Sequence, residues 1–464
     1  MVIQKRLGIF GGAFFLALAL TAPAQEPAFL GQVPIPDPAV HTAERTKKEA
    51  REAFKKEMET EALAGALAQP LTPETEALYR KAFWAALHTR DRSERVKNAL
   101  GQVLANYHAQ TDDETRRKAL EAIYGLFPTE FQAEITALLP TITDKKQFAM
   151  AAYYLLRIDP DGTRRTIREA ASEHFGQLNL TDDPIIVALR RELRPRMNMQ
   201  ASLEKRPPLE DLLGARELLG RTVLFSLHRH NRIIPGIALI RKADGSFLRR
   251  EDGTLWHIPH LAQSASGLPG TITNGYSPQG LYSITGTGVS ENQFIGPTPF
   301  IDAYMPFEIH ANAWFDDDSG TTITMTQTAY SALLPQGWNR YFPMTEAFLA
   351  GKAGRSGIIA HGTTTNPEFY KDEPFYPLVP SLGCIKSLEV WDPQTGKLKK
   401  SDQIDLLRSW NDAGAGRGWL VLAEIDTKET PIQLADIHEA VVMAENALGI
   451  VPETPTEKAA EGGN

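Results

Sequence analysis

A single cysteine and an upstream histidine stand out among the residues that could carry out covalent chemistry. Cys384 is the only cysteine of the 464 residues and lies in the segment Ser-Leu-Gly-Cys-Ile-Lys, 381–386. His361 ends a short apolar segment and is followed by Gly362 and Thr363. The thiolate is the nucleophilic form of cysteine, and a neighbouring imidazole can accept the thiol proton. The pair predicts acyl transfer through a thioester, with Cys384 as nucleophile and His361 as general acid and base.

The residues next to Cys384 favour a reactive site. Gly383 permits a tight turn and close approach of a substrate, and the backbone N–H groups around Gly383 and Cys384 are suited to an oxyanion hole. Ser381 is expected to support this turn. The alternative is a structural cysteine beside an unrelated histidine, because free cysteines are often buried.

Residues 1–24 have the pattern of a secretory signal peptide. Lys5 and Arg6 precede an apolar run over 7–20, and the sequence Ala-Pro-Ala at 22–24 provides a cleavage site. An uncleaved membrane anchor is the alternative, but the apolar run is shorter than the roughly 20 residues that span a bilayer. We therefore expect export to the periplasm or cell wall, with no transmembrane span in the mature chain.

The composition excludes several classes of protein. With 42% hydrophobic residues, 23% charged residues and a net charge of −8, the chain is globular rather than disordered. The acidic balance without a long basic run argues against a nucleic-acid partner. The paired histidines, His228 with His230 and His257 with His260, have no cysteine or carboxylate at metal-ligand spacing. No metal and no cofactor are therefore expected.

The hydrophobic periodicity divides the chain into a helical and a strand-rich part. Residues 25–40 are proline-rich and predict a linker. Residues 41–215 predict successive helices in an antiparallel array or a short solenoid, a domain of unknown role. Residues 216–428 predict short strands separated by turns, 429–450 a C-terminal helix, and 451–464 a disordered tail. The strands are expected over 222–227, 236–240, 280–284, 321–326, 357–360 and 419–425. The expected fold class is multidomain α + β, with a mainly-β sandwich or barrel-like sheet in the second half.

The motifs around His361 and Cys384 resemble those of the L,D-transpeptidases with a YkuD-type catalytic domain. The signature of that family is His-Gly, a spacer, and then [Ser/Thr]-His-Gly-Cys-[Ile/Val]-Arg. This chain has His361-Gly362 followed by the segment 381–386. The resemblance extends over about 220–426 and implies a YkuD-like catalytic domain there.

Two further segments carry the same resemblance, and three features depart from it. Residues 276–284 are similar to the family's Pro-x-Gly strand, and 418–425 to its closing strand. Leu382 replaces a histidine, and Lys386 replaces an arginine, which retains the charge but loses the bidentate geometry. The spacer is rich in proline and aromatic residues, including Tyr376, and is either a substrate lid or an ordered surface insertion.

The resemblance implies formation of peptidoglycan crosslinks. Cys384 would attack the amide before the terminal D-residue of a tetrapeptide stem, and His361 would move the proton. An amine of a neighbouring stem would then take the acyl group. The substrate-binding positions expected around the motif are Gly362, Thr363, Lys386 and Tyr376.

Other functions remain open at this stage. The same acyl-enzyme could pass its acyl group to water, which would make the protein an L,D-carboxypeptidase or endopeptidase. A catalytically inactive scaffold that binds the cell wall is the alternative of another class. The helical half could bind a partner protein or glycan strands.

Overall fold

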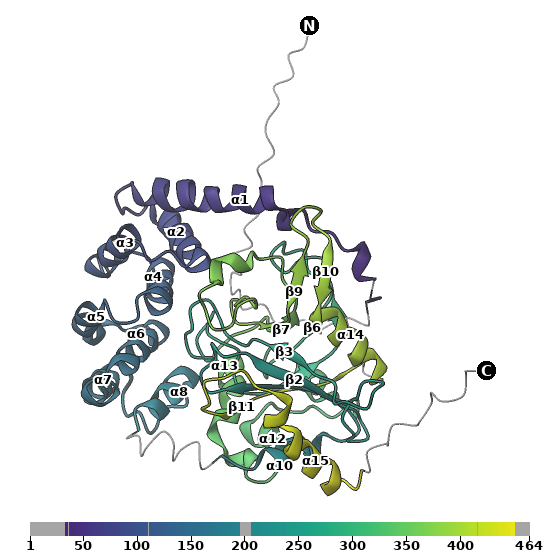
Figure 1. The fold of residues 1–464 in the computed structure, drawn as a ribbon. Coiled ribbons are helices and arrows are strands. Elements are labelled where there is room, and N and C mark those ends of the chain that lie inside the picture. The colour runs from purple at the N-terminus through teal and green to yellow at the C-terminus, as the bar shows by residue number, and fades with distance from the viewer. Residues whose placement is uncertain (1–32, 36, 110, 195–205, 415, 451–464) are drawn as a thin grey trace.

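The computed structural model shows helices in the N-terminal half of the chain and strands in the C-terminal half (Figure 1). It describes residues 33–35, 37–109, 111–194, 206–414 and 416–450. The expected signal peptide, most of the expected linker and the expected tail lie outside these ranges. In the described ranges, no helix has the length and apolar character needed to cross a membrane.

The helical half is a curved array in which α2 packs on α4, and α6 packs on α7 and α8 (Figure 1). Aspartates cap four of its helices, because a carboxylate accepts hydrogen bonds from the free N–H groups of a first turn. These caps are Asp112, Asp144, Asp159 and Asp183. The helices are α1 Lys48–Glu57, continued by a π-helical segment Met58–Gly65, α2 Glu76–Thr89, α3 Glu94–Ala105, α4 Asp113–Leu126, α5 Gln132–Leu138, α6 Lys145–Ile158, α7 Pro160–Phe175 and α8 Pro184–Glu192.

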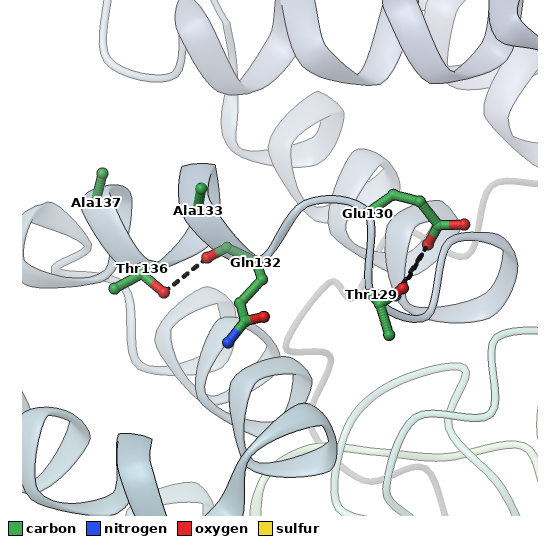
Figure 2. Close-up of a pocket in the computed structure, with 6 residues that line it drawn as sticks. All are labelled: Thr129, Glu130, Gln132, Ala133, Thr136 and Ala137. Carbon is green, nitrogen blue, oxygen red and sulfur yellow. Dashed lines mark hydrogen bonds between the residues drawn. The ribbon is translucent and has the colours of Figure 1, made fainter.

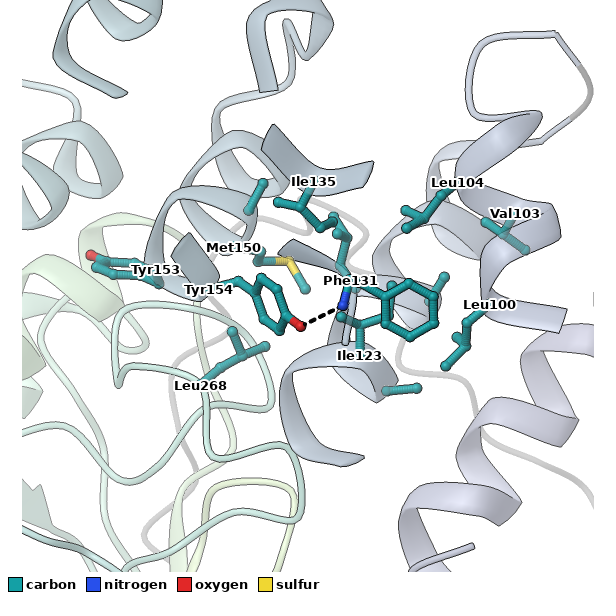
Figure 3. Packing of buried hydrophobic residues seen from close by; sticks show 14 of the residues in the cluster. Leu100, Val103, Leu104, Ile123, Phe131, Ile135, Met150, Tyr153, Tyr154 and Leu268 are labelled. Carbon is teal, nitrogen blue, oxygen red and sulfur yellow. Dashed lines mark hydrogen bonds between the residues drawn. The ribbon is translucent and has the colours of Figure 1, made fainter. Parts of the chain in front are cut away.

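The core of the helical half includes residues of the other half. Figure 3 shows Leu268 packed in the same cluster as Ile123, Met150 and Tyr154. The Tyr154 hydroxyl donates to the carbonyl of Phe127 at 2.8 Å, so its polar end is satisfied within the core. Since this cluster is continuous across the boundary, the helices are fixed against the strand-rich half.

The strand-rich half contains a five-stranded and a four-stranded sheet. The first has the order β3 Ile258–His260, β2 Gly236–Arg241, β1 Thr222–Arg229, β11 Gly418–Asp426 and β4 Gly280–Ile284. Only β1 and β11 pair in parallel within it. The second has the order β5 Thr287–Gly288, β6 Phe300–Asp302, β7 Ile359–His361 and β8 Ile385–Lys386. A separate hairpin joins β9 Glu389–Trp391 and β10 Leu398–Ser401.

Backbone bridges connect the two sheets at both edges. Ser283 of β4 pairs with Tyr304 after β6, and Leu261 after β3 pairs with Lys386 of β8. A buried core between the sheets takes residues from both, including Leu224, Leu420, Tyr282, Ile301, Ala360 and Ile385. The bridges and this shared core give the two sheets a barrel-like arrangement.

Most of the predicted strands are present, but the one expected over 321–326 is wrong. That segment has no partner strand, and its threonine side chains are exposed. Asn312 holds it instead, since the Ile323 N–H donates to Asn312 Oδ1 at 2.9 Å. Alternating threonines favour extended backbone, but a strand also needs a neighbouring strand to pair with.

The C-terminal half has more helix than expected. Its helices are α11 Ala311–Phe315, α12 Gln327–Ser331, α13 Glu346–Lys352, α14 Asp402–Asp412 and α15 His438–Ala447. The short helix α10 Leu209–Leu213 precedes them, within the range 41–215 that was expected to be helical. Several are single turns, too short to show helical periodicity in the sequence. The C-terminal helix predicted over 429–450 is present in shorter form as α15.

The described end of the predicted linker is bound to the strand-rich half. The Val33 N–H donates to Thr287 Oγ1 at 2.9 Å, and the Leu398 N–H donates to the carbonyl of His41 at 3.1 Å. Thr42 forms a bridge with Lys397. The segment before α1 therefore runs along the strand-rich half, and Figure 1 shows this segment near β9 and β10.

Candidate active site

The parallel pairing of β7 and β8 brings the two halves of the motif together. Ala360 is opposite Ile385, and His361 is opposite Lys386. Cys384 immediately precedes β8. Because side chains two residues apart point to the same side of a strand, Cys384 and Lys386 share a face with His361.

The Cys384 thiol is half-buried and donates to the carbonyl of Gly357 at 3.4 Å. Burial raises the pKa of the thiol, while the Ile359 N–H and the charges of Lys386 and Arg355 act in the opposite direction. The resting group is therefore a protonated thiol. Within the described residues, it forms no hydrogen bond with the imidazole on the same face.

His361 is a neutral, oriented imidazole. Its Nδ1 lies 2.6 Å from the carbonyl oxygen of Gly362, which fixes the tautomer with the proton on Nδ1. The lone pair of Nε2 is then free to accept a proton. Burial, together with the charge of Lys386, lowers the pKa of His361 well below 6.5. The side chain is only 2% exposed.

The turn before Cys384 is held by Ser381. Its Oγ accepts from the Gly383 N–H at 2.8 Å and donates to the carbonyl of Cys384 at 2.7 Å. Ser277 Oγ donates to the carbonyl of Gly383 at 2.7 Å. The Gly383 N–H predicted for the oxyanion hole is thus already used by Ser381. The Cys384 N–H forms no hydrogen bond with another described residue, so it is the donor available at this turn.

Arg355 lies directly beneath the turn. Its Nη2 donates to the carbonyl of Gly275 at 2.7 Å, and its Nη1 donates to that of Tyr276 at 2.8 Å. Gly383 has a φ of +121°, and a Cβ at this position would lie 2.1 Å from Arg355 Nη2. The turn therefore requires glycine both for its backbone conformation and for the space that the guanidinium occupies.

Arg355 was not predicted, because an isolated arginine 29 residues upstream gives no sequence signal. Two buried carboxyls were also missed. Glu308 accepts from the Gly357 N–H at 2.7 Å, directly behind the thiol's acceptor, and burial raises its pKa to about 7. Burial likewise raises the pKa of Glu389 to about 7.

Three predicted substrate-binding residues are enclosed by protein. Lys386 is 4% exposed, and its Nζ lies 3.5 Å from His361 Nδ1. A Cβ on Gly362 would lie 2.1 Å from the Glu389 carboxyl carbon. Thr363 donates its N–H to Glu389 Oε2 at 2.8 Å, and its hydroxyl to a backbone carbonyl at 3.0 Å. These contacts position the end of β7.

Tyr376, the fourth predicted substrate-binding residue, lies on the exposed side of the loop 366–380. Its side chain is 43% exposed, and its hydroxyl donates to Glu368 Oε1 at 3.1 Å. The rest of the loop is packed, with a small core that includes Tyr370 and Phe375. The loop is thus ordered, and Tyr376 is the aromatic residue of the loop whose ring is exposed to solvent.

The helical half holds this loop in place. Arg90 at the end of α2 forms an ion pair with Glu373 at 2.6 Å and donates to the carbonyl of Ala265 at 3.2 Å. The ring of Phe369 lies 5.7 Å from that of His88. The segment between the predicted base and nucleophile is therefore held against α2 by an ion pair and an aromatic contact.

Two hollows formed by described residues lie away from Cys384. A depression of about 590 Å³ is formed by α5 and the turn before it, lined by Thr129, Glu130, Gln132, Ala133, Thr136 and Ala137 (Figure 2). Its one carboxylate, Glu130, accepts from its own turn. A cavity of about 10 Å³ lies between Thr363, Leu378 and Glu389, with room for about one water molecule.

One histidine from each of the two sequence pairs, His228 and His260, takes part in a hydrogen-bonded chain in the first sheet. Ser226 Oγ lies 2.8 Å from His228 Nε2 and 3.1 Å from His260 Nδ1, and all three residues are buried. His230 instead contacts Glu424 at 2.9 Å. The described residues contain no group of three or more histidine, cysteine or acidic side chains arranged to hold a metal ion.

Neither a protein-family model, nor a curated protein, nor a solved structure matches this chain.

Proposed function

We propose that this protein is an exported peptidoglycan L,D-transpeptidase whose YkuD-like catalytic domain occupies about residues 216–428. The observation that supports the proposal is the parallel β7–β8 pair, in which His361 is opposite Lys386 and Cys384 directly precedes Ile385. The strand that contains His361 and the strand that directly follows Cys384 are thus neighbours, although 22 residues separate His361 from Cys384 in the chain. The turn held by Ser381 presents the thiol next to a free backbone N–H.

The proposed reaction begins with a protonated thiol and a neutral imidazole. When the donor peptide binds, Cys384 Sγ attacks the carbonyl carbon of the L-to-D amide, and its proton passes to His361 Nε2. The Cys384 N–H stabilises the oxyanion. The C–N bond breaks, His361 returns the proton to the departing D-amino acid, and a thioester remains.

The second half-reaction reverses these roles. An amine of a neighbouring stem peptide attacks the thioester carbonyl, and His361 takes the proton of that amine. The C–S bond breaks, the sulfur recovers the proton, and a new amide joins the two stems. Lys386 and Arg355 favour the transient thiolate, since their charges lower the pKa of the thiol.

The test is mass spectrometry of the mature protein incubated with a disaccharide-tetrapeptide. We expect a covalent adduct lacking the terminal D-residue, followed by a crosslinked dimer. Cys384→Ala and His361→Gln should give neither product. His310→Gln is a matched control, because this exposed histidine caps the short helix α11.

Two other outcomes of this experiment would indicate a different function. Tripeptide without dimer would identify the protein as a carboxypeptidase, since water would then be the acceptor. Absence of any adduct, together with retained binding to isolated cell walls, would contradict an enzymatic function and favour a scaffold.

A further inference from the structure

Two arginines at the start of the helical half form no ion pair with any carboxylate of the described residues. Arg45 is in the short helix Glu44–Thr46 and Arg51 is in α1, and both are half-buried. Arg45 Nη1 and Arg51 Nε are buried and have no hydrogen-bond partner among the described residues. Burying a cationic donor without an acceptor is unfavourable, so the arrangement requires an explanation.

Phe294 connects Arg45 to the catalytic strand. The guanidinium carbon of Arg45 lies 3.6 Å from the centroid of the Phe294 ring. The carbonyl of Phe294 accepts from the Thr363 hydroxyl at 3.0 Å and from the Thr364 N–H at 3.1 Å. Since Thr363 follows His361 by two residues, Arg45 is close to the end of β7.

His88 of α2 completes the group. Its ring lies 5.3 Å from that of Phe294 and 5.7 Å from that of Phe369. Its Nε2 is buried and has no partner among the described residues. Burial and the charges of Arg45 and Lys386 lower the pKa of His88 to about 3, so the ring is neutral. His88 is thus within electrostatic reach of both Arg45 and Lys386.

The surrounding protein does not supply the missing anion. Glu368 is the acidic group whose charge acts on Arg51. It is exposed, and its carboxylate accepts from the Tyr376 hydroxyl at 3.1 Å. The cation–π contact with Phe294 accounts for the position of Arg45, but it satisfies no N–H group. Buried donors of two arginines and one histidine therefore remain unpaired among the described residues next to the site.

We propose that Arg45, Arg51 and His88 form a carboxylate-binding subsite, through which the helical half holds the acyl-donor peptide beside His361. This inference rests on the proposed function, and it gives the helical half a role in substrate binding. Guanidinium groups match the two oxygens of a carboxylate, and the neutral imidazole can donate a further hydrogen bond. The donor tetrapeptide carries free carboxylates, whereas the sugars to which the stem peptides are attached do not.

The experiment compares two probes, the disaccharide-tetrapeptide with free carboxylates and the same molecule with its carboxylates converted to amides. Calorimetry with the full mature chain carrying Cys384→Ala measures binding without turnover. We expect Arg45→Met to weaken binding of the free-carboxylate probe by about tenfold, as loss of a charged hydrogen bond predicts. Binding of the amidated probe should stay unchanged, and Arg45→Lys should retain part of the affinity.

Arg165→Met is the matched control, because this exposed arginine of α7 pairs only with Glu169 on the same helix. Thermal unfolding of each variant shows whether the fold is intact. Equal loss of affinity for both probes, or no loss for either, would overturn the subsite. If Arg45→Lys and Arg45→Met both weaken binding of the amidated probe as well, the arginine is structural and the subsite is also overturned.

The outcomes separate the subsite from the proposed function. Carboxylate-selective binding that depends on Arg45, without any thioester in the protein with intact Cys384, would retain the subsite and reject the enzyme. A thioester that forms equally well in Arg45→Met, with an unchanged KM for the free-carboxylate donor, would retain the enzyme and reject the subsite.

Discussion

Lys386 stands directly opposite His361 in the parallel pair of β7 and β8, with its Nζ 3.5 Å from His361 Nδ1. Nδ1 already directs its proton to the carbonyl of Gly362, so it has no lone pair for the ammonium. The contact between the two side chains is therefore electrostatic. It keeps the imidazole neutral and places a positive charge on the face that carries Cys384.

The first prediction concerns Lys386→Met, which removes this charge with little change in volume. Without the ammonium, the pKa of the Cys384 thiol should rise further and that of His361 should rise toward its ordinary value. We expect alkylation of Cys384 by iodoacetamide to slow by about tenfold at pH 7, the change that one pKa unit produces. Lys386 is mostly protonated at that pH, because burial lowers its pKa to about 8.

Rates of alkylation across a pH series, followed by mass spectrometry, would check this result. Lys400→Met is the control, since this exposed lysine of β10 pairs with Asp402. An unchanged pH profile in Lys386→Met would mean that the lysine charge does not act on the thiol.

The sequence predicted the broad division of the fold, because hydrophobic periodicity reflects local structure. Most of the strands in the C-terminal half were visible as apolar runs, and the C-terminal helix as a longer periodic segment. The strand expected over 321–326 failed because β propensity does not reveal whether a partner strand exists. Single-turn helices such as α11 are too short for a periodic signal.

The site was predictable only in part for a related reason. The spacing of His361 and Cys384 indicated the motif, but their relation in space depends on the β7–β8 pairing. Arg355 and Glu308 lie in other segments and act on the thiol through their charges, and no local pattern marks them. Lys386 was expected to bind substrate, whereas its burial beside His361 gives it an electrostatic contact that a linear motif does not express.

The second prediction concerns Gly383→Ala. The new Cβ would lie 2.1 Å from Arg355 Nη2, and the residue would keep a φ of +121°. We expect a loss of about 2–4 kcal/mol in the free energy of unfolding, from overpacking and backbone strain together. Urea unfolding measures the change.

Gly414→Ala separates these two causes. Gly414 also has a positive φ, +74°, but a Cβ there would have no neighbour within 4 Å. Its substitution should therefore cost only the backbone contribution, about 1 kcal/mol. Equal losses in the two variants would show that the contact with Arg355 does not constrain the turn.

The third prediction uses the buried carboxyl of Glu389, whose pKa burial raises to about 7. A raised pKa means that the folded protein binds this proton more tightly than the unfolded chain. The resulting stability is therefore complete below about pH 4.5 and is lost as the pH rises through about 7. The glutamine of Glu389→Gln is uncharged at every pH, so the variant should not lose this stability as the pH rises.

Paired measurements at pH 5 and pH 8 would test the sign. The variant should gain stability relative to the unsubstituted protein by about 2 kcal/mol on going from the lower to the higher pH. Glu169→Gln on the exposed surface of α7 provides the control. A relative gain in the opposite direction would mean that Glu389 is ionised in the fold.

The fourth prediction concerns the ion pair between Arg90 and Glu373, which joins α2 to the loop 366–380 at 2.6 Å. Both side chains are largely shielded from solvent, so Glu373→Gln leaves the guanidinium without its counter-charge. We expect a loss of about 1–3 kcal/mol in stability and faster amide hydrogen exchange confined to the loop.

Glu368→Gln in the same loop is the control. It should leave hydrogen exchange nearly unchanged, because the Glu368 carboxylate is exposed. Since the loop connects the predicted base to the nucleophile, its release should also lower acyl-enzyme formation in the variant. Faster exchange throughout the helical half would instead place the effect of Glu373 on the whole interface, and would contradict a local clamp.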